Sequence, residues 1–301
     1  MSERRREALK QKRIRQVRRQ IAAICVVLIA AVIAIGVYVL KPGESKKVSG
    51  ETLVEMEVSN QEEAAAKETE KKAEEVQEIE EKVETPEERL KRVKTEAKEA
   101  GYPEKVIKLL AKNPETVDFV EAYGEKKDIT SPEIIEELKE GEIPRLIQWD
   151  ERWGYAPYGT GIIAVCGCGP TTLSMVLSGL TGDNTLTPAK LAQYGTEHNY
   201  LNEKNDTMWS FMTEACKEWG VKCKEGILDK AEVVKELNAG HPIVCSVGPG
   251  DFTQSGHFIV LAGLKGEELI VHDPFSITNS EKPWKFDDIK DQIKVMWVYS
   301  K

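Results

Sequence analysis

Residues 21–40 form a continuous apolar run without a charged side chain. At ~1.5 Å per residue, a helix of this length spans ~30 Å, which is the thickness of the hydrocarbon core of a bilayer. Cleavable signal peptides have a shorter apolar region of ~7–15 residues, followed by small residues at the cleavage site. Here Leu40 is followed by Lys41 and Pro42. The run therefore predicts an uncleaved transmembrane signal-anchor helix.

The charges are unevenly distributed along the chain. Residues 1–20 carry nine basic and two acidic side chains, although the whole chain has a net charge of -9. A basic terminus can bind nucleic acid, but its position directly before an apolar run favours a basic cytoplasmic tail at a membrane. The positive-inside rule then places residues 1–20 in the cytoplasm and the chain after about Lys41 outside it. We expect a single-pass protein of the cell membrane with an extracellular C-terminal region and no nucleic-acid partner.

The next segment, residues 41–85, is dominated by charge. Within it, residues 61–85 contain ten glutamates and four lysines and few large apolar side chains. Such a composition buries too little surface to offset the entropy of ordering, so we expect a charged extracellular linker or stalk. The alternative is a coiled-coil dimer, because apolar residues from Val76 to Val93 fall on heptad positions, but Pro86 interrupts that register. The oligomeric state stays open.

Residues 86–142 carry repeated signals for the start of a helix. Thr85 precedes a proline and is followed three residues later by a glutamate, which is the pattern of a capping box, and Ser131 also precedes a proline. Gly101 and Gly124 are expected to separate short helices from one another. The segment is therefore predicted to be a short helical prefix that packs on the domain after it.

Residues 143–301 contain all six tryptophans and all four histidines, as a globular core with a functional site requires. Apolar residues first recur with helical spacing and then alternate as in strands. This order, helices first and a probably antiparallel sheet second, predicts an α+β fold. The expected helices are at about Pro170–Leu180, Pro188–His198, Thr207–Trp219 and Lys230–Leu237, and the expected strands are at Ile243–Val247, His257–Leu264, Glu268–His272 and Lys294–Tyr299.

A cysteine stands directly before the first of these helices. Cys168 is followed by Gly169 and Pro170, and proline is favoured in the first turn of a helix. The unpaired N–H groups and the positive end of the helix dipole favour thiolate over thiol at this place, which would make the sulfur a better nucleophile. The alternative is a small, buried, unreactive cysteine.

A thiolate nucleophile needs a proton carrier, and His257 stands at the start of an otherwise apolar strand. A hairpin through residues 265–267 leads to a returning strand that ends at Asp273, which this topology sets beside His257. A carboxylate there can hold the second imidazole nitrogen and fix the orientation of the ring. Taken singly, His257 is also consistent with a structural histidine and Asp273 with a turn residue before Pro274.

The ordered motifs resemble the C39-like peptidases of bacteria, a family of papain-like cysteine peptidases. This resemblance covers roughly residues 143–301 and implies a papain-like fold, a peptide or protein substrate, and neither a cofactor nor a metal. It also implies that Cys168 is the nucleophile, His257 the general acid and base, Asp273 the orienting residue and Gln148 the oxyanion donor. The motifs that carry it are Gln148-Trp149-Asp150 with Trp153-Gly154, Gly167-Cys168-Gly169-Pro170-Thr171, Gly256-His257-Phe258 and Asp273-Pro274.

Two features of these residues leave alternatives open. Gln148 lies farther before the nucleophile than is usual in papain-like enzymes, so a packing role is the alternative to the oxyanion role. The remaining cysteines raise two further possibilities, disulfides and a zinc site, although the spacing fits the usual C-x2-4-C pairs poorly. The zinc site would use Cys166, Cys168, Cys216 and Cys223, and the disulfides would be formed among Cys166, Cys216, Cys223 and Cys245.

Other functions are compatible with the same thiol and imidazole. A peptidoglycan amidase or endopeptidase would use the same chemistry on a related fold, and a catalytically silent surface module would keep the fold without turnover. His198, His241 and His272 are expected to serve local structure, because neighbouring residues of a strand, such as His272 and Asp273, point to opposite faces.

Overall fold

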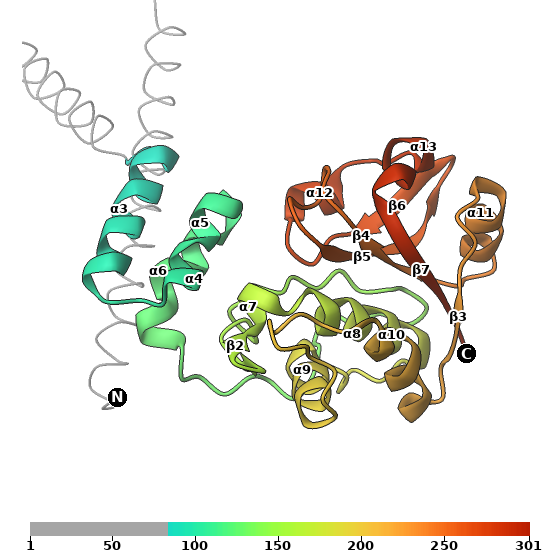
Figure 1. Ribbon diagram of the computed structural model, residues 1–301, viewed down its shortest axis with the longest axis horizontal. Helices are drawn as coiled ribbons and strands as arrows, with labels where there is room; N and C mark the ends of the chain where they lie inside the picture. Colours follow the sequence, from blue (N-terminus) through green and yellow to red (C-terminus); the bar gives the residue numbers. More distant parts are fainter. Residues whose placement is uncertain (1–83) are drawn as a thin grey trace, which may run out of the picture. The chain divides into compact units, whose positions relative to one another are not determined.

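The computed structural model describes residues 84–301 (Figure 1). The predicted tail at 1–20, the predicted membrane helix at 21–40 and nearly all of the predicted linker at 41–85 lie outside these residues. Within 84–301, none of the helices combines the length and apolar composition needed to cross a membrane. The membrane anchor stays a prediction from the sequence.

The prefix begins with four α-helices and one 3-10 helix. The capping box at Thr85 is present, since its hydroxyl accepts from Glu88 N while the Glu88 carboxylate accepts from Thr85 N. Gly101, with φ of 70°, separates the first two helices. Val93, Leu109 and Phe119 form the centre of the apolar cluster between these elements. The elements are α3 (Pro86–Glu99), α4 (Glu104–Ile107), α5 (Leu109–Lys112), η1 (Pro114–Thr116) and α6 (Val117–Lys126).

Two sequence predictions for the prefix are wrong. Gly124 does not break a helix but lies inside α6, where the Tyr102 hydroxyl accepts from Gly124 N at 3.0 Å and leaves no room for a side chain. No helix starts at Ser131, because the chain there runs as an irregular strap. Ile135 anchors this strap through its buried side chain and through a 2.8 Å bond from Ile135 N to Asn184 O. Tertiary burial outweighs the local helix signal.

The helical layer of the domain is built around α8 (Cys168–Thr181), whose Leu173, Met175 and Leu177 side chains are fully buried. Truncating one such side chain to alanine costs about 2–5 kcal/mol, so α8 is a rigid support for its first residue, Cys168. The other elements of this layer are the hairpin of β1 (Pro157–Tyr158) and β2 (Gly161–Ile162), α7 (Ile163–Cys166), α9 (Pro188–Glu197), α10 (Trp209–Glu214) and η2 (Ala215–Trp219).

The second layer is a five-stranded antiparallel sheet with the order β3-β7-β4-β5-β6. The predicted α+β architecture, with helices first and an antiparallel sheet second, is confirmed. Of the five strands of this sheet, the sequence prediction missed only β3, because its mostly exposed residues show no apolar alternation. The strands are β3 (Lys222–Glu225), β4 (Ile243–Val247), β5 (His257–Lys265), β6 (Glu268–His272) and β7 (Ile293–Ser300).

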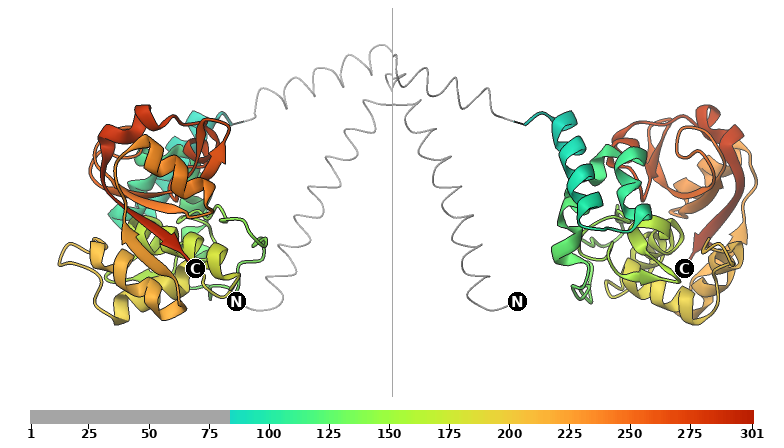
Figure 2. Two further views of the ribbon diagram at one scale, coloured as in Figure 1. Left: turned by 90° about the vertical axis from the view of Figure 1, so that its right-hand side faces the viewer. Right: turned by 60° about the vertical axis from the view of Figure 1, so that its left-hand side comes forward.

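The sheet is covered on both faces (Figures 1 and 2). One face packs on α8 through Val244, Val260 and Trp297. On the other face the cluster includes Val233 of α11 and Phe286 of α13. The elements beside the sheet are α11 (Lys230–Asn238), α12 (Ile277–Glu281), α13 (Phe286–Ile289) and η3 (Lys290–Gln292). This packing places α8, which starts at Cys168, against the sheet that contains β5, which starts at His257.

Candidate active site

Cys168 is the first residue of α8, and the two glycines beside it explain its position. A Cβ on Gly167 would lie 2.5 Å from Ile163 Cγ2, and a Cβ on Gly169 would lie 2.5 Å from Thr207 Oγ1. Only glycine therefore lets the chain pass this closely on both sides of the cysteine. The Gly-Cys-Gly triplet is a packing requirement that presents the thiol at the start of a buried helix.

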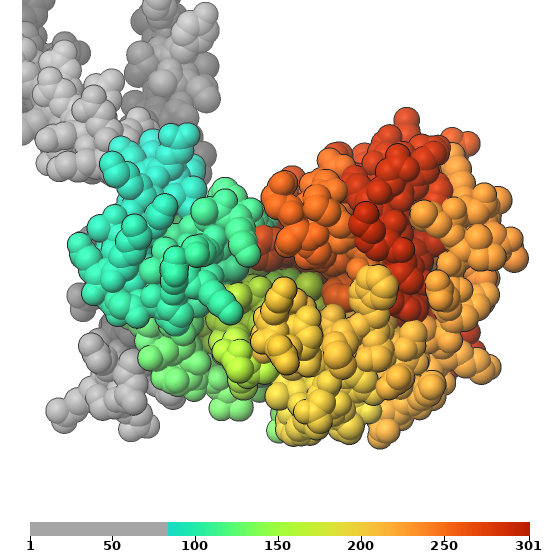
Figure 3. Space-filling model, viewed as in Figure 1, coloured from blue at the N-terminus to red at the C-terminus, as the bar shows by residue number. Residues whose placement is uncertain are grey.

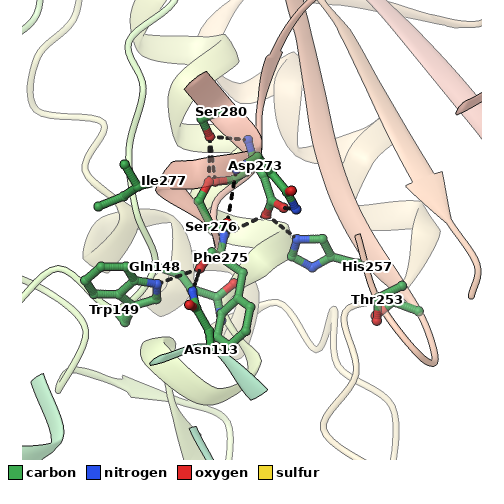
Figure 4. A network of polar contacts seen from close by, with 12 residues as sticks. Asn113, Gln148, Trp149, Thr253, His257, Asp273, Phe275, Ser276, Ile277 and Ser280 are labelled. Atoms are coloured by element: carbon green, nitrogen blue, oxygen red, sulfur yellow. Dashed lines mark hydrogen bonds and ion pairs between the residues drawn. The ribbon is translucent and has the colours of Figure 1, made fainter. Parts of the chain in front are cut away.

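His257 is the first residue of β5, and its side chain is buried, with 8% exposed. Its Nε2 lies 2.8 Å from Asp273 Oδ1 (Figure 4). The neighbouring Cys168 side chain also raises the pKa of the imidazole. With Nε2 engaged by the carboxylate, Nδ1 is the nitrogen left for the sulfur. The structure thus brings His257 and Asp273 into contact, with Cys168 as a neighbour of the imidazole.

Asp273 follows β6 and is 1% exposed. Its Oδ1 accepts from His257 and, at 2.8 Å, from Phe275 N, while its Oδ2 accepts from Asn279 Nδ2 at 2.9 Å. Burial alone would raise the pKa of this carboxyl, but the positive charge of His257 and these hydrogen bonds lower it below the ordinary value. Asp273 is therefore a charged, immobilised acceptor rather than a carboxylic acid.

The pKa of His257 is set by opposing effects. Burial lowers it, whereas the charge and hydrogen bond of Asp273 and the neighbouring Cys168 thiol raise it by more, to about 10. The folded site therefore holds the imidazole in its protonated form at neutral pH. An imidazolium beside a thiol can stabilise a thiolate and can deliver a proton to a leaving group.

Gln148 is 3% exposed and lies against α7. Its Nε2 donates to Ala164 O at 2.9 Å and, more weakly, to Ile163 O at 3.4 Å, while Gln148 N donates to Pro274 O at 2.7 Å. Both amide hydrogens therefore face carbonyls of α7 rather than an open site. Its Oε1 is buried without a hydrogen-bond partner. The oxyanion role of Gln148 stays a prediction, and it requires the amide to turn.

Sequence reasoning missed the residues that support Asp273. Ser280 Oγ accepts from Asp273 N at 2.9 Å, and Asn279 binds the carboxylate as described above. Both lie in α12, a helix of five residues that carries no periodic signal. The capping serine, Ser276, whose side chain accepts from Asn279 N, was the one local sign that a helix begins there.

The other histidines lie outside this group. His198 Nδ1 is 2.9 Å from Tyr194 O, and His241 Nδ1 is 2.7 Å from a Glu236 carboxylate oxygen. His272 Nδ1 lies 3.3 Å from Pro144 O, and burial lowers the pKa of His272 to about 4. The contacts of His198 and His241 are local in the sequence, as expected, whereas His272 contacts Pro144, a residue 128 positions away.

The cysteines within residues 84–301 are all free thiols. Cys166 accepts a hydrogen bond from Asn205 Nδ2 at 3.0 Å, and burial raises the pKa of its thiol to about 11. Cys216 is buried in the apolar cluster on which Cys223 packs, whereas Cys245 is buried in the sheet. Across the described part of the chain, no three cysteine, histidine or acidic side chains are grouped in a way that would hold a metal ion.

The site lies in a chain that matches a known family. The model of the Peptidase_C39 like family matches residues 140–301, which is more than half of the sequence. The protein belongs to the Peptidase_C39-like family, in agreement with the resemblance of its motifs. No curated protein matches the chain.

Two solved structures are similar to this chain. One is a Bacillus anthracis protein assigned as a C39-like peptidase, with 18% identity and a TM-score of 0.37, covering 57% of this chain and 98% of its own. The other is the peptidase domain of ComA, a bi-functional ABC transporter of Streptococcus involved in a quorum-sensing pathway. It has 18% identity and a TM-score of 0.33, and covers 45% of this chain and 92% of its own.

Proposed function

We propose that this protein is a membrane-anchored, extracytoplasmic cysteine peptidase that hydrolyses peptide bonds through Cys168, His257 and Asp273. The observation that carries the proposal is the buried 2.8 Å contact between His257 and Asp273, on an imidazole whose pKa the neighbouring Cys168 raises. A structural histidine needs one satisfied nitrogen; here a carboxylate holds one nitrogen, and Cys168 is a neighbour of the ring. Membership of the Peptidase_C39-like family supports the reaction class.

The first half of the proposed reaction forms a thioester. The Cys168 sulfur, as thiolate, attacks the carbonyl carbon of the scissile bond, a C–S bond forms, and the carbonyl electron pair moves onto oxygen. The tetrahedral species then collapses. The C–N bond breaks, and His257 Nδ1 gives its proton to the departing amine. Asp273 remains charged throughout and keeps the ring aligned.

The second half regenerates the enzyme. His257, now neutral, takes a proton from a water molecule, whose oxygen attacks the thioester carbonyl. Collapse of this second intermediate breaks the C–S bond, releases the acid product and returns the thiolate beside the imidazolium. N–H groups in the first turn of α8 have no acceptor within the helix, so they supply donors for the oxyanion irrespective of Gln148.

The place of action follows from the proposed topology. An anchor at residues 21–40 and a charged linker at 41–85 would hold the domain outside the cytoplasm, so the substrates would be peptides or proteins at the cell surface. Figure 3 shows that the surface is hollowed where the prefix, the helical layer and the segment around α12 meet, as access for a polypeptide requires.

The proposal is tested by incubating the full-length protein in detergent with a broad peptide library and mapping the cleaved bonds by mass spectrometry. Wild-type protein and a Cys223→Ser control should cleave the same bonds, and Cys168→Ala should cleave none. A parallel incubation with purified cell wall distinguishes a peptidoglycan hydrolase. Cleavage of cell wall alone, or equal activity of Cys168→Ala, would overturn the proposal.

A further inference from the structure

The prefix reaches across the chain to the segment that follows Asp273. Glu115, in η1, accepts from Ile277 N at 2.8 Å and from Thr278 N at 2.9 Å, and it also accepts from the Thr278 hydroxyl. These bonds join residues more than 160 positions apart in the sequence. Burial raises the pKa of Glu115, but the hydrogen bonds outweigh it and lower the pKa, so the carboxylate is charged.

A second contact is made at Phe275, two residues closer to Asp273 in the sequence. Asn113 Nδ2 and Trp149 Nε1 both donate to Phe275 O, at 2.6 and 2.7 Å (Figure 4). Asn113 is buried, and its own Oδ1 accepts from Glu115 N. The prefix therefore holds residues 275–278 at two points through one continuous network.

This held segment is directly coupled to the catalytic carboxylate. Phe275 N donates to Asp273 Oδ1, the same oxygen that meets His257 Nε2. The Phe275 ring also lies edge-on to the imidazole, with centroids 6.4 Å apart at 74°. A shift of Phe275 would therefore displace both the Asp273 carboxylate and the ring that packs against the imidazole.

We propose that Glu115 is a positioning residue of the active site, so that the prefix is a working part of the enzyme rather than a spacer. Through residues 275–278, Glu115 fixes the carboxylate that orients His257. The inference rests on the proposed function, since it assigns a support to the Cys168 and His257 pair. Both Asn113 and Glu115 lie before residue 140, where the family match begins, so this support is an addition to the shared domain.

If the prefix only packs on the domain, weakening any of its carboxylate contacts should affect the active site equally. Glu121 of α6 is also a prefix carboxylate that binds through ion pairs, but its partners, Arg89 and Arg92, both lie in α3. Glu121→Gln weakens the prefix without touching residues 275–278, which makes it the matched control for Glu115→Gln. In Glu115→Gln, an NH2 group replaces one of the two carboxylate oxygens. One of the two backbone N–H groups, of Ile277 or Thr278, then faces a donor and loses its acceptor.

The test uses full-length protein and the alkylation of Cys168 by iodoacetamide, located by peptide fragmentation, as a function of pH. Glu115→Gln should slow the alkylation near neutral pH by roughly 10-fold or more, as is usual for residues that orient a functional side chain. The rise of the alkylation rate with pH, which reports formation of the thiolate, should also move to higher pH, because a misplaced Asp273 stabilises the imidazolium less and the imidazolium then stabilises the thiolate less. Glu121→Gln should match wild type in both respects.

Thr278→Val, which removes one donor to Glu115 from the other side, should give a smaller change of the same kind. Circular dichroism melting of every variant separates loss of folding from loss of positioning. If wild-type Cys168 reacts no faster than Cys223 and His257→Ala changes nothing, the proposed function itself is wrong. If wild type reacts fast and needs His257, but Glu115→Gln and Thr278→Val behave like Glu121→Gln, only the positioning role is wrong.

Discussion

His257 Nε2 and Asp273 Oδ1 lie 2.8 Å apart, and neither side chain is more than 8% exposed. The contact joins the first residue of β5 to the residue after β6, two strands linked by the turn at Gly266. A buried ion pair of this kind is costly to break, because the remaining partner loses its solvation without compensation. The pair therefore makes both the proposed reaction and the stability of the domain depend on the charges of these two residues.

Replacing Asp273 by asparagine should abolish most of the activity. The amide keeps the size of the side chain but removes the negative charge that raises the pKa of His257. Peptide hydrolysis should fall by about 10²–10⁴-fold, the usual contribution of a general acid or base. Steady-state kcat/KM measures this, with Asp287→Asn, an exposed ion-pair variant in α13, as control. A fall of less than twofold would contradict the orienting role.

The pH dependence of stability should report the same pair. The folded pKa of His257 is raised, so its contribution is complete below the unfolded value of about 6.5 and is lost as the pH rises toward about 10. Asp273 has a lowered pKa, so its contribution is present above about 3.9 and is lost as the pH falls. The melting temperature of wild type should exceed that of His257→Gln most near pH 6, and less at pH 10. A constant difference would argue against the coupling.

Adding a methyl group at Gly169 should destabilise the helix that carries the nucleophile. The new Cβ would meet Thr207 at 2.5 Å, and overpacking of this kind costs typically about 1–3 kcal/mol. Urea unfolding of Gly169→Ala gives the change in the free energy of unfolding. Gly256→Ala is the control, since no atom lies within 4 Å of a Cβ at that position. Equal stability of the two variants would show that Thr207 can move away from the new methyl group without a cost in free energy, and would contradict the prediction.

Gln148→Ala separates the two roles open to this residue. In the structure the amide ties Gln148 to the α7 carbonyls, so its removal should lower the free energy of unfolding by about 1–3 kcal/mol. Activity at a temperature where the variant stays folded should then fall only modestly. A 10²-fold or greater loss of kcat at unchanged stability would instead identify the amide as the oxyanion donor.

The proposed topology is open to a direct measurement. Protease added to intact spheroplasts should degrade the region after Lys41, while an epitope placed before residue 20 stays protected. Replacing two apolar residues of the 21–40 run by lysine should release the protein from the membrane fraction. Protection of the C-terminal region in intact cells would place the domain in the cytoplasm.

Much of the fold could be predicted because the signals are local. The Thr85 capping box, the four long strands of the sheet and the helix after Cys168 depend on residues within a few positions of each other. The contact between His257 and Asp273 was also predictable, since a short hairpin places the start of its first strand beside the end of its second strand. The irregular strap at Ser131 was not, because Ile135 is held by Asn184 from a distant part of the chain.

By itself, the sequence determined the class of fold and indicated the candidate thiol, imidazole and carboxylate, because periodicity, capping and short connections act over a few residues. Only the tertiary structure decided how that carboxylate is held. The hydrogen bonds that Thr278 N donates to Glu115 and that Asn113 donates to Phe275 O span more than 160 positions. A single sequence contains no pattern that identifies such pairs, since the packing of whole helices and strands decides which distant residues come into contact.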